Sequence, residues 1–476
     1  MEYINTRNKE EIVNDKNAII NGLAGNGGLY VPKEIKKIDD IYKLKDLDYK
    51  DLAYNIISIF FSDLDLKNSI DKAYDNFDTK EITPLKKINN NYFLELYHGP
   101  TCAFKDVALQ LLPYILTKAN NDKKPIFILS ATSGDTGKAA LEAFKDIDNT
   151  NICVLYPYKM VSTVQERQMT TTLGNNTDVV AVKGNFDDCQ RLVKEISKNN
   201  KFDNIHLTSA NSINIARLIP QTVYYFKAYF DLLKNNEIKK DELIDFYVPT
   251  GNFGNILAGY IAKELGLPIN KLICASNKNN VLTDFLNDGI YNANRNFYNT
   301  MEPSIDILVS SNLERLLYLK SKDTNLVKDL MDSLNNNKKY KISEELLKKI
   351  QKDFIGIYCN EEEVKQSIKE YYDKYNYLVD PHSATALAAS KKFDSNHKKV
   401  ILSTASPFKF SKDVYKCLTN KDINDDLDAI KTLENYTNIK APYNLSSLEN
   451  KEVRFKEVIN KDDEKTLILK IGAKNV

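Results

Sequence analysis

Two pairs of glycines in this sequence each follow a short apolar run and precede an amphipathic window. The first pair lies in Ala131-Thr132-Ser133-Gly134-Asp135-Thr136-Gly137, and the second lies in Gly251-Asn252-Phe253-Gly254-Asn255. A glycine-rich turn that leads into a helix presents several backbone N–H groups, aided by the helix dipole, to an anion. The chain holds only 16 glycines in 476 residues, so two such junctions favour anion binding over two ordinary tight turns.

The spacing of these glycines argues against a nucleotide ligand. A Walker A loop needs four residues between its glycines and Ser or Thr after its lysine, whereas here Lys138 is followed by Ala139 and the glycines Gly134 and Gly137 are closer together. The second loop, Gly251–Gly254, does not match the dinucleotide fingerprint G-x-G-x-x-G. A ligand with a single phosphate is the interpretation that remains.

A third segment, His98-Gly99-Pro100-Thr101-Cys102-Ala103-Phe104-Lys105-Asp106, could carry a reactive amine. Lys105 falls near the start of a predicted helix, where the helix dipole disfavours a cation. Burial there would lower the pKa of Lys105, and Schiff-base chemistry requires a lysine of that kind. Taken alone, the segment is more typical of a surface lysine beside a helix-capping Asp106, so its meaning depends on the rest of the chain.

The elements that would position these residues alternate between strand and helix from about residue 92. Apolar runs typical of buried strands are Tyr92–Leu96, Ile126–Ala131, Ile152–Tyr156, Val179–Val182, Ile244–Val248, Lys271–Ala275 and Val400–Thr404. Windows of helical periodicity lie between them, at 106–117, 136–144, 186–199, 213–233 and 255–265. This alternation predicts α/β domains with parallel sheets. It also places both glycine pairs at the carboxyl ends of strands, where open α/β sheets bind ligands.

The pattern divides the chain into four regions. Residues 1–85 form an N-terminal region with a glycine cluster at Gly22–Gly28 and a helical stretch at Asp51–Phe61. Residues 86–310 form the α/β core, in two sub-domains, that carries the lysine and both loops. Residues 311–378 are rich in Lys, Glu, Asp and Asn and predict a helical insertion, after which residues 379–476 return to the core and end in a polar tail.

Composition narrows the classes of partner. Lys and Arg number 66 and Asp and Glu number 65, so the net charge of +1 predicts no nucleic-acid partner and no membrane partner. The six cysteines form no C-x-x-C and the four histidines have no ligand spacing, so we expect no metal site. The N-terminus lacks the apolar run of a signal peptide, which favours a cytoplasmic protein with reduced thiols that acts on a small molecule.

In combination, the motifs resemble the pyridoxal-phosphate enzymes of fold type II and, within them, the threonine synthase family. The resemblance lies in His98–Asp106, Ala131–Gly137, Ser209–Asn214 (S-A-N-S-I-N), Gly251–Asn255, Asp380–His382 (D-P-H) and Ser403–Phe410 (S-T-A-S-P-F-K-F). The order and spacing fit over roughly residues 1 to 410. Several long motifs in the family's order are much more specific than one glycine loop. The resemblance implies two parallel-sheet α/β domains of the fold type II architecture, with pyridoxal 5'-phosphate as cofactor.

The resemblance also implies a role for individual residues. Lys105 matches the lysine that holds the cofactor. Gly251, Asn252, Phe253, Gly254 and Asn255 match the cradle for the cofactor phosphate, and Thr404 matches the hydroxyl residue that faces the pyridine nitrogen. The residues implied to meet the substrate are Thr101, Ser133, Gly134, Asp135, Thr136, Ser212, Asn214 and Arg217. Arg217 suits the substrate phosphate, because a planar guanidinium forms bidentate phosphate contacts, but an ordinary ion-paired arginine fits the sequence equally well.

The reaction implied for the family converts O-phospho-L-homoserine and water into L-threonine and phosphate. A serine/threonine dehydratase or cysteine synthase of the same fold is the alternative enzyme, disfavoured by the His98–Thr101 lead-in and the long N-terminal region. A catalytically silent binding protein of the same fold is the alternative from another class, and the presence of Lys105 argues against it. The family commonly has T-A-H-P where this chain has Thr404-Ala405-Ser406-Pro407, which puts a histidine role there in doubt. The sequence leaves a monomer and a homodimer equally open.

Overall fold

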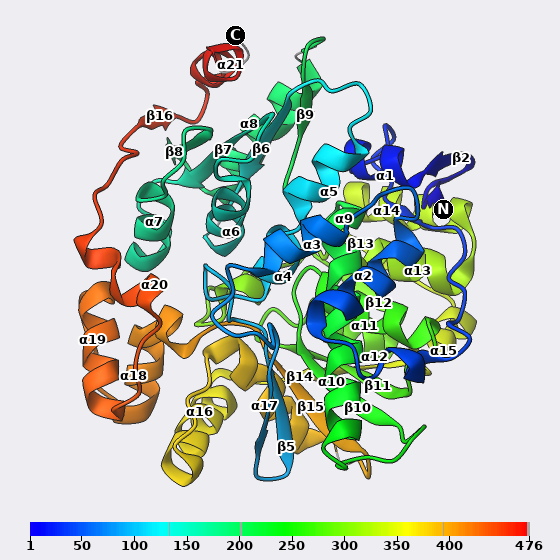
Figure 1. Cartoon of the computed structure of the whole chain (residues 1–476), viewed down its shortest axis with the longest axis vertical. Helices are drawn as coiled ribbons and strands as arrows, with labels where there is room; N and C mark the ends of the chain where they lie inside the picture. The colour runs from blue at the N-terminus through cyan, green and yellow to red at the C-terminus, as the bar shows by residue number, and fades with distance from the viewer. Residues whose placement is uncertain (133, 200–201, 394, 474–476) are drawn as a thin grey trace.

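Two parallel β-sheets form the body of the molecule, one above the other in Figure 1. The computed structural model describes residues 1–132, 134–199, 202–393 and 395–473. The larger sheet has the strand order β14-β11-β10-β15-β5-β4, and the smaller sheet has the order β16-β8-β7-β6-β9. Neighbouring strands in both sheets are parallel except for β4 and β5. The prediction of parallel α/β sheets is therefore confirmed.

The larger sheet is covered by helices on both faces. Its strands are β4 (Leu85–Ile88), β5 (Asn91–Glu95), β10 (Ile244–Pro249), β11 (Ile269–Ser276), β14 (Phe354–Tyr358) and β15 (Lys398–Ser403). Its main helices are α10 (Thr222–Lys234), α11 (Gly254–Glu264), α12 (Val281–Asp288), α16 (Glu361–Tyr375), α17 (Pro381–Lys392) and α18 (Ser411–Thr419). Because side chains alternate across a strand, Phe246 and Val248 of β10 join the core with α10 and α11. Tyr247 joins the separate core with α16 and α17.

The smaller sheet is built in the same way. Its strands are β6 (Ile126–Ala131), β7 (Thr150–Pro157), β8 (Thr177–Lys183), β9 (His206–Thr208) and β16 (Val458–Asn460). Its helices are α4 (Lys105–Leu109), α5 (Leu112–Ala119), α6 (Asp135–Phe144), α7 (Thr163–Thr170), α8 (Phe186–Asn199) and α21 (Glu464–Ala473). Ile128 of β6 packs in the main core, and its neighbour Leu129 packs with residues of α8 and α21. The continuous apolar runs in the sequence are thus strands buried on both faces.

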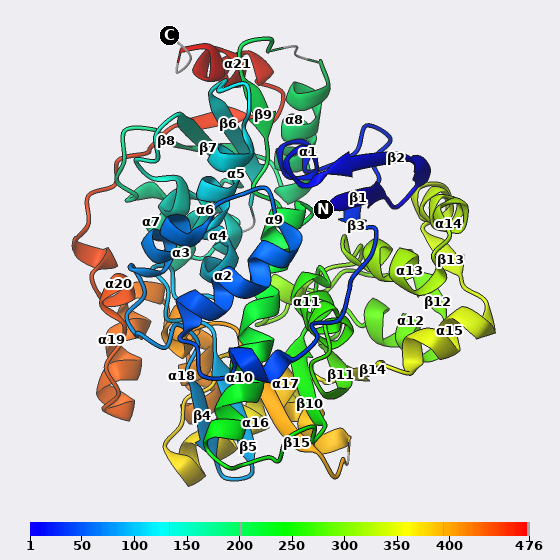
Figure 2. The ribbon, with the colours of Figure 1, turned by 45° about the vertical axis from the view of Figure 1, so that its right-hand side comes forward.

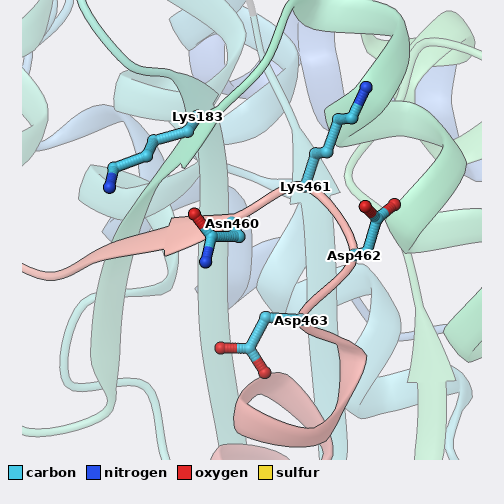
Figure 3. Close-up of a pocket in the computed structure, with 5 residues that line it drawn as sticks. All are labelled: Lys183, Asn460, Lys461, Asp462 and Asp463. Carbon is cyan, nitrogen blue, oxygen red and sulfur yellow. The ribbon is translucent and has the colours of Figure 1, made fainter.

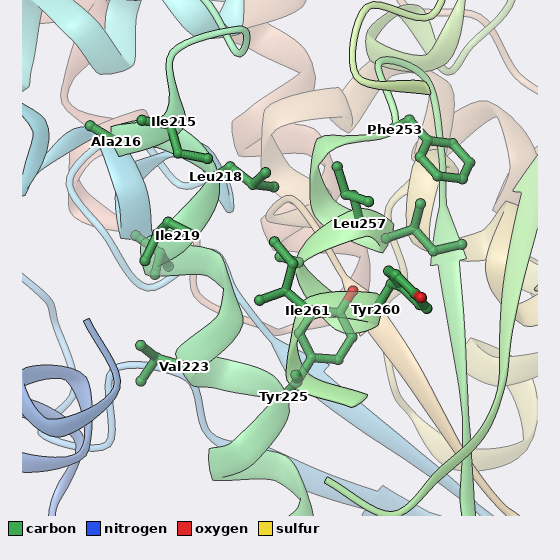
Figure 4. Close-up of a cluster of buried hydrophobic side chains, with 14 of the residues drawn as sticks. Ile215, Ala216, Leu218, Ile219, Val223, Tyr225, Phe253, Leu257, Tyr260 and Ile261 are labelled. Atoms are coloured by element: carbon green, nitrogen blue, oxygen red, sulfur yellow. The ribbon is translucent and has the colours of Figure 1, made fainter. Parts of the chain in front are cut away.

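Helix α11, which carries the second glycine loop, is held by an apolar contact with its neighbours. Figure 4 shows Leu257 and Ile261 of α11 facing Leu218 of α9 (Ile215–Leu218) and Tyr225 of α10. These side chains are at most 1% exposed. A glycine at position 259 allows this approach, because a Cβ there would lie 2.7 Å from the Tyr225 ring. The N-terminus of α11 is therefore fixed by a buried helix–helix contact rather than by its loop alone.

The N-terminal region is a small antiparallel sheet followed by helices. It contains β1 (Glu2–Asn5), β2 (Asn8–Asn14), β3 (Tyr30–Pro32), α1 (Asp15–Asn21), α2 (Tyr49–Phe60) and α3 (Lys67–Tyr74). Strand β1 lies between β2 and β3. Part of the glycine cluster is explained by close approach: a Cβ at Gly28 would lie 1.9 Å from Asn5 Oδ1. The helix predicted at Asp51–Phe61 is α2, whereas no pattern predicted the three short strands.

The segment predicted as a helical insertion, 311–378, also contains strands. It holds α13 (Leu313–Ser321), α14 (Thr324–Asn337), β13 (Lys339–Lys341), α15 (Glu344–Gln351), β14 and α16. Strand β14 pairs in parallel with β11 at the edge of the larger sheet, so an entirely helical insertion is wrong. The five residues of β14 lie between two highly charged helices, which hid their short apolar pattern.

The tail crosses from the larger sheet to the smaller one, as Figure 1 shows in orange and red. After α19 (Asp426–Thr437) and α20 (Tyr443–Ser446), it adds β16 in parallel beside β8 and ends in α21. Leu467 and Ile471 of α21 are buried in the core on one face of the smaller sheet. Across the described ranges, the helices are all too short or too polar to span a membrane.

Candidate active site

The three segments singled out in the sequence meet between the two sheets. Lys105 begins α4, the first glycine loop leads into α6, and the second leads into α11. Thr404 follows β15, and its carbonyl accepts a hydrogen bond of 2.8 Å from the backbone N–H of Phe104. Figure 2 shows α4, α6 and α11 in the middle of the molecule, below the smaller sheet and above the larger one. The site thus forms where the carboxyl ends of strands from both sheets face each other.

Lys105 is a buried amine with few partners. Its side chain is 12% exposed, and its Nζ lies 3.3 Å from Ser304 Oγ and 3.5 Å from Asp135 Oδ2. Burial lowers the pKa of Lys105, and the positive charges of Lys409 and Arg217 lower it further, whereas Asp135 opposes the shift. The structure therefore gives Lys105 the lowered pKa that Schiff-base chemistry requires.

Asp135, the first residue of α6, lies between two lysines. Its Oδ1 contacts Lys409 Nζ at 3.1 Å and accepts a hydrogen bond of 3.0 Å from Gln165 Nε2, while its Oδ2 faces Lys105. Burial alone would raise the pKa of Asp135, but the charges of Lys409 and Lys105 outweigh it and keep the pKa well below its usual range. The carboxylate is therefore ionised throughout the physiological pH range.

Ser304 is a central residue of the site that sequence reasoning missed. Its Oγ donates to Asp135 Oδ2 at 3.2 Å and accepts from Lys105 Nζ. Its backbone N–H donates to His382 Nε2 at 3.0 Å. Its backbone oxygen lies 2.9 Å from where a Cβ of Gly251 would stand. Ser304 therefore joins the lysine, the first loop and the second loop, but it lies in a stretch with no strand or helix period that could have pointed to it.

Lys409 was missed as a site residue, although it lies inside the quoted motif Ser403–Phe410. Its side chain is fully buried, and its Nζ donates to the backbone oxygen of Thr101 at 2.9 Å as well as contacting Asp135. Lys409 thus joins the backbone of the lysine motif to the carboxylate at the start of α6. In the sequence, however, nothing separates it from a surface lysine at a helix start.

The second glycine loop leaves the N-terminus of α11 open to an anion. Phe253 stands at the N-cap position in the left-handed conformation, with φ of 63°, and no side chain caps the helix. Gly251 has no room for a Cβ because Ser304 and Ile305 press against it. On the other side, the backbone N–H and the side-chain amide of Asn312 both donate to Asn252 O, at 3.1 and 3.0 Å. The loop is thus held from behind, with its N–H groups available to a ligand.

Asn255, in the first turn of α11, is fixed by two tyrosines. Its Oδ1 accepts hydrogen bonds from Tyr224 at 2.6 Å and from Tyr225 at 2.9 Å. Because both tyrosine hydroxyls donate to Oδ1, the orientation of the Asn255 side-chain amide is fixed, and its Nδ2 group points away from the tyrosines. In the described part of the chain, Asn255 Nδ2 is buried without a hydrogen-bond partner. An unpaired buried donor at an uncapped helix N-terminus fits a phosphate oxygen.

Thr404 lies at the end of a chain of hydrogen bonds that runs back to His382. The backbone N–H of Thr404 donates to Ser383 Oγ at 2.9 Å, and Ser383 donates to Asp380, the N-cap of α17. Asp380 also accepts from His382 Nδ1 at 3.1 Å. Because His382 Nε2 accepts from a backbone N–H, the proton of this ring is on Nδ1. The predicted D-P-H motif therefore supports the site from behind.

The residues predicted to bind substrate do not all reach the same place. Gly134, Asp135 and Thr136 lie at the N-terminus of α6, next to Lys105; Ser133 lies outside the described residues. At this helix start, Thr132 Oγ1 accepts hydrogen bonds of 2.9 Å from the N–H groups of Gly134 and Gly137. Thr101 is fully buried, and both its N–H and its hydroxyl donate to Asp106 at 2.8 Å.

The segment around Ser212 borders the second loop. Asn312 Nδ2 lies 3.5 Å from Ser212 Oγ. Asn214 is nearly fully buried, caps α9 through its Oδ1 and donates to Ile19 O at 2.9 Å, so its side chain is used by the fold.

Arg217 is a buried guanidinium without a carboxylate. It is 3% exposed, and NH1 donates to the backbone oxygen of Ala210. Within the described ranges, Nε has no partner, and no acidic side chain contributes to the electrostatics of Arg217. Burial lowers its pKa to about 10, so the group stays charged at neutral pH. The described residues thus give Arg217 no carboxylate partner, so the ion-paired arginine that the sequence allowed is not what the structure contains.

The hollow near the C-terminus and the thiol of Cys102 do not form a second reactive site. A hollow near the C-terminus is lined by Lys183, Asn460, Lys461, Asp462 and Asp463, but Figure 3 shows these side chains pointing apart rather than toward one point. Among the described residues, no group of His, Cys, Asp and Glu side chains is placed to hold a metal ion. Cys102 is buried and its pKa is raised to about 12 by burial, which suits a small core residue better than a nucleophile.

Comparison with known proteins gives the same family along the whole chain. Residues 79–404 match the family model described as pyridoxal-phosphate dependent enzyme. Residues 2–74 match the model described as threonine synthase N terminus, and residues 383–467 match threonine synthase, C-terminal. The three models together include every motif quoted from the sequence.

Individual relatives agree with these models. The chain is 37% identical to threonine synthase of Saccharomyces cerevisiae, over 88% of this chain and 89% of the yeast protein. It is 38% identical to threonine synthase of Pseudomonas aeruginosa, over 87% of this chain and 90% of the relative. The crystal structure of pyridoxal-phosphate-bound threonine synthase from Brucella melitensis superimposes with a TM-score of 0.90 at 36% identity, covering 100% of this chain and 99% of that one.

Proposed function

The chain belongs to the threonine synthase family of pyridoxal-phosphate-dependent enzymes, and we propose that it converts O-phospho-L-homoserine and water into L-threonine and phosphate with the residues described above. The observation that carries this assignment is the contact of Lys105 with Asp135 and Ser304, with Ser304 in turn against the second glycine loop. A reactive amine and an anion cradle thereby lie on two sides of one serine.

The residues present fit pyridoxal phosphate. Its phosphate would be held by the N–H groups of Gly251–Asn255, at the uncapped N-terminus of α11, with the unpaired Asn255 Nδ2 as a further donor. Lys105 would hold its aldehyde carbon, and Thr404 would face its ring nitrogen. When bound, the cofactor supplies an electron sink for the negative charge that is left when a proton leaves the substrate carbon.

Lys105 acts as the general base in this proposal. A base has to be neutral to accept a proton, and burial together with Lys409 and Arg217 lowers the pKa of this amine toward the working pH. Asp135 and Ser304 lie within 3.5 Å of Lys105 Nζ. These two side chains would position the amine when it is not bonded to the cofactor. The same amine then returns the proton to the substrate.

The substrate carries two anionic groups, and the site offers a cationic or N–H-rich position for each. The carboxylate fits the N-terminus of α6 at Asp135 and Thr136; the N–H groups of Gly134 and Gly137 on either side of them donate to Thr132 Oγ1 at 2.9 Å. The phosphate fits Arg217, whose buried guanidinium has no carboxylate partner among the described residues. Lys409 keeps Asp135 from repelling these anions, because its charge balances the carboxylate at 3.1 Å.

We propose a cytoplasmic enzyme, since all six cysteines are buried and, in the part that the structure describes, none forms a disulfide. A net charge of +1 supports a small-molecule substrate rather than a nucleic acid.

The assignment is tested by incubating the purified holoenzyme with O-phospho-L-homoserine and measuring threonine and phosphate. We expect equimolar release, whereas 2-oxobutyrate would indicate a dehydratase and no product a silent relative. Lys105→Ala should abolish both turnover and the visible absorbance of the bound cofactor. Lys118→Ala, which changes an exposed lysine of α5, is the matched control and should change neither.

A further inference from the structure

Arg315 is a fully buried arginine outside the residues that face the lysine or the substrate. We propose that it is a positioning residue: its guanidinium fixes Asn312 and, through Asn312, the loop Gly251–Asn255, and ties that loop to the N-terminal sheet. The inference rests on the proposed role of this loop as the cradle of the cofactor phosphate. It also gives the N-terminal region a task in the chemistry of the site.

The guanidinium of Arg315 bridges three parts of the chain. Its Nε donates to the backbone oxygen of Tyr30 in β3 at 2.8 Å. Its NH1 donates to Asn312 Oδ1, and its NH2 donates to the backbone oxygen of Ile213, next to Ser212. One planar group thus connects the N-terminal sheet, the support of the phosphate loop and the segment proposed to border the substrate. A planar fork of donors suits this task, and a lysine cannot reproduce it.

Arg315 decides the orientation of the Asn312 amide. Because Oδ1 accepts from Arg315, the Nδ2 group points to the phosphate loop, where it donates to Asn252 O at 3.0 Å. The backbone N–H of Asn312 donates to the same oxygen at 3.1 Å. Turned the other way, the amide oxygen would face the carbonyl of Asn252 and repel it. The double hydrogen bond that holds the loop therefore depends on the arginine behind it.

The N-terminal sheet holds Arg315 through its neighbour Glu314. Arg7 binds the Glu314 carboxylate with two hydrogen bonds, Nε to Oε1 at 2.8 Å and NH2 to Oε2 at 2.7 Å. Thr6 donates its hydroxyl to Oε1 and accepts from the N–H of Leu29 at 2.9 Å. Glu314 is 5% exposed and Arg7 is 16% exposed, so this ion pair is sheltered from solvent. Such bidentate pairs are stronger and more directional than surface salt bridges.

This network explains features of the sequence that the reaction itself leaves unused. Asn5-Thr6-Arg7 stands where the family opens with S-T-R, and its Thr and Arg are the two residues that grip Glu314. Gly28 allows β1 and the loop before β3 to approach, since any side chain there would strike Asn5. The N-terminal strands are thus shaped to deliver the Tyr30 carbonyl and the Arg7 side chain to α13.

The test compares cofactor binding in three variants of the full-length protein. Arg315→Lys removes the fork but keeps the charge, and Arg7→Met releases Glu314 from the periphery. Lys33→Met removes an exposed ion pair with Glu2 in the same sheet and is the matched control. Apoprotein of each is titrated with pyridoxal phosphate by visible absorbance, and the ³¹P resonance of the bound phosphate is recorded. Thermal unfolding is measured in parallel.

We expect Arg315→Lys to raise the Kd for pyridoxal phosphate about tenfold or more, as for loss of a buried charged hydrogen bond, and to shift the ³¹P resonance. Arg7→Met should shift the same two readouts in the same direction by less, and Lys33→Met should match the wild type. In Arg315→Lys, the KM for O-phospho-L-homoserine should rise at saturating cofactor. The kcat of this variant should change little, because Lys105 is untouched.

A fall in thermal stability with unchanged Kd and unchanged ³¹P resonance would overturn the inference and leave Arg315 a purely structural residue. If Arg315→Lys fails to fold, Arg7→Met decides alone, because Arg7 is partly exposed and touches no residue of the loop. These readouts do not depend on turnover, so they separate this inference from the proposed reaction. Wild-type enzyme that binds the cofactor but makes no threonine would contradict only the latter.

Discussion

Asp135 and the two lysines beside it form a charge cluster in which each member depends on the others. Lys105 and Lys409 approach opposite oxygens of the carboxylate, at 3.5 and 3.1 Å. The carboxylate raises the pKa of Lys105, while burial and the Lys409 charge lower it. The charge of Lys409 thus acts on Lys105, the proposed general base, through the carboxylate they share.

Replacing Lys409 with Met should move the acidic limb of the kcat profile to higher pH. Loss of its positive charge raises the pKa of Lys105, because Asp135 then stabilises the protonated amine alone, opposed by burial and Arg217. The base is active when unprotonated, so a higher pKa shifts the limb upward, by about one pH unit for one charge at this range. The measurement is kcat at saturating substrate from pH 6 to 10.

Lys409→Arg is the control for this prediction. It keeps the positive charge next to Asp135 and should keep the limb near its wild-type position, even if packing costs some stability. An unshifted limb in Lys409→Met would show that the charge of Lys409 does not reach the base.

The conformation of the loop before helix α11 depends on a glycine. The loop needs glycine at 251, because a Cβ there would lie 2.9 Å from Ser304 O and 3.1 Å from Ile305 Cα, both backbone atoms that cannot turn aside. Substituting Ala should therefore displace the loop or the Ser304 segment, with a strain of about 1–3 kcal/mol typical of overpacking. We expect the Kd for pyridoxal phosphate to rise about tenfold, which corresponds to 1.4 kcal/mol.

The same titration of Gly25→Ala gives the matched comparison. Gly25 lies in the N-terminal glycine cluster, where a Cβ would meet no atom within 4 Å. That variant should bind the cofactor as the wild type does. Equal affinities in Gly251→Ala and the wild type would mean that the loop tolerates the extra carbon and is softer than its contacts indicate.

Strands formed by continuous apolar runs could be predicted from the sequence. Elements without a clear run of this kind could not. The runs at Ile126–Ala131 and Ile244–Val248 are strands because they are buried on both faces, and the glycine loops follow from their ends. Strand β14 escaped prediction, since its short apolar run lies between the highly charged helices α15 and α16. Ser304 escaped for a different reason: its importance comes from contacts with Lys105, Asp135 and His382, which are distant in the sequence.

The whole molecule brings together parts that the sequence keeps far apart. The N-terminal sheet reaches the phosphate loop through α13, and the tail returns to complete the smaller sheet beside β8. The motif order made the family predictable from the sequence. Asn312 and Arg315 could not be assigned in that way, because their hydrogen bonds join three separate segments and leave no local pattern.

Stability on the scale of the whole chain should depend on a buried carboxyl, Glu302, two residues before Ser304. It is fully buried; Asn277 Nδ2 donates to its Oε2 at 3.3 Å, and in the described chain its Oε1 has no partner. Burial raises the pKa of Glu302 to about 7, against a weaker opposing effect of the Thr300 hydroxyl and His382. The native protein therefore keeps a proton that the unfolded chain, with an ordinary carboxyl, has lost.

The sign of the pH effect follows from that proton. Between the unfolded pKa near 4.5 and the folded pKa of about 7, the native state binds more protons, so the free energy of unfolding falls as pH rises. From pH 5 to pH 8 this one group should remove about 2 kcal/mol. Glu302→Gln, which is neutral at every pH, should flatten this decline in urea unfolding of the holoenzyme. Glu10→Gln, at a carboxylate 82% exposed to solvent, should retain the wild-type slope. A Glu302→Gln curve parallel to the wild type would mean that Glu302 is ionised in the folded protein and is paired more closely than its contacts show.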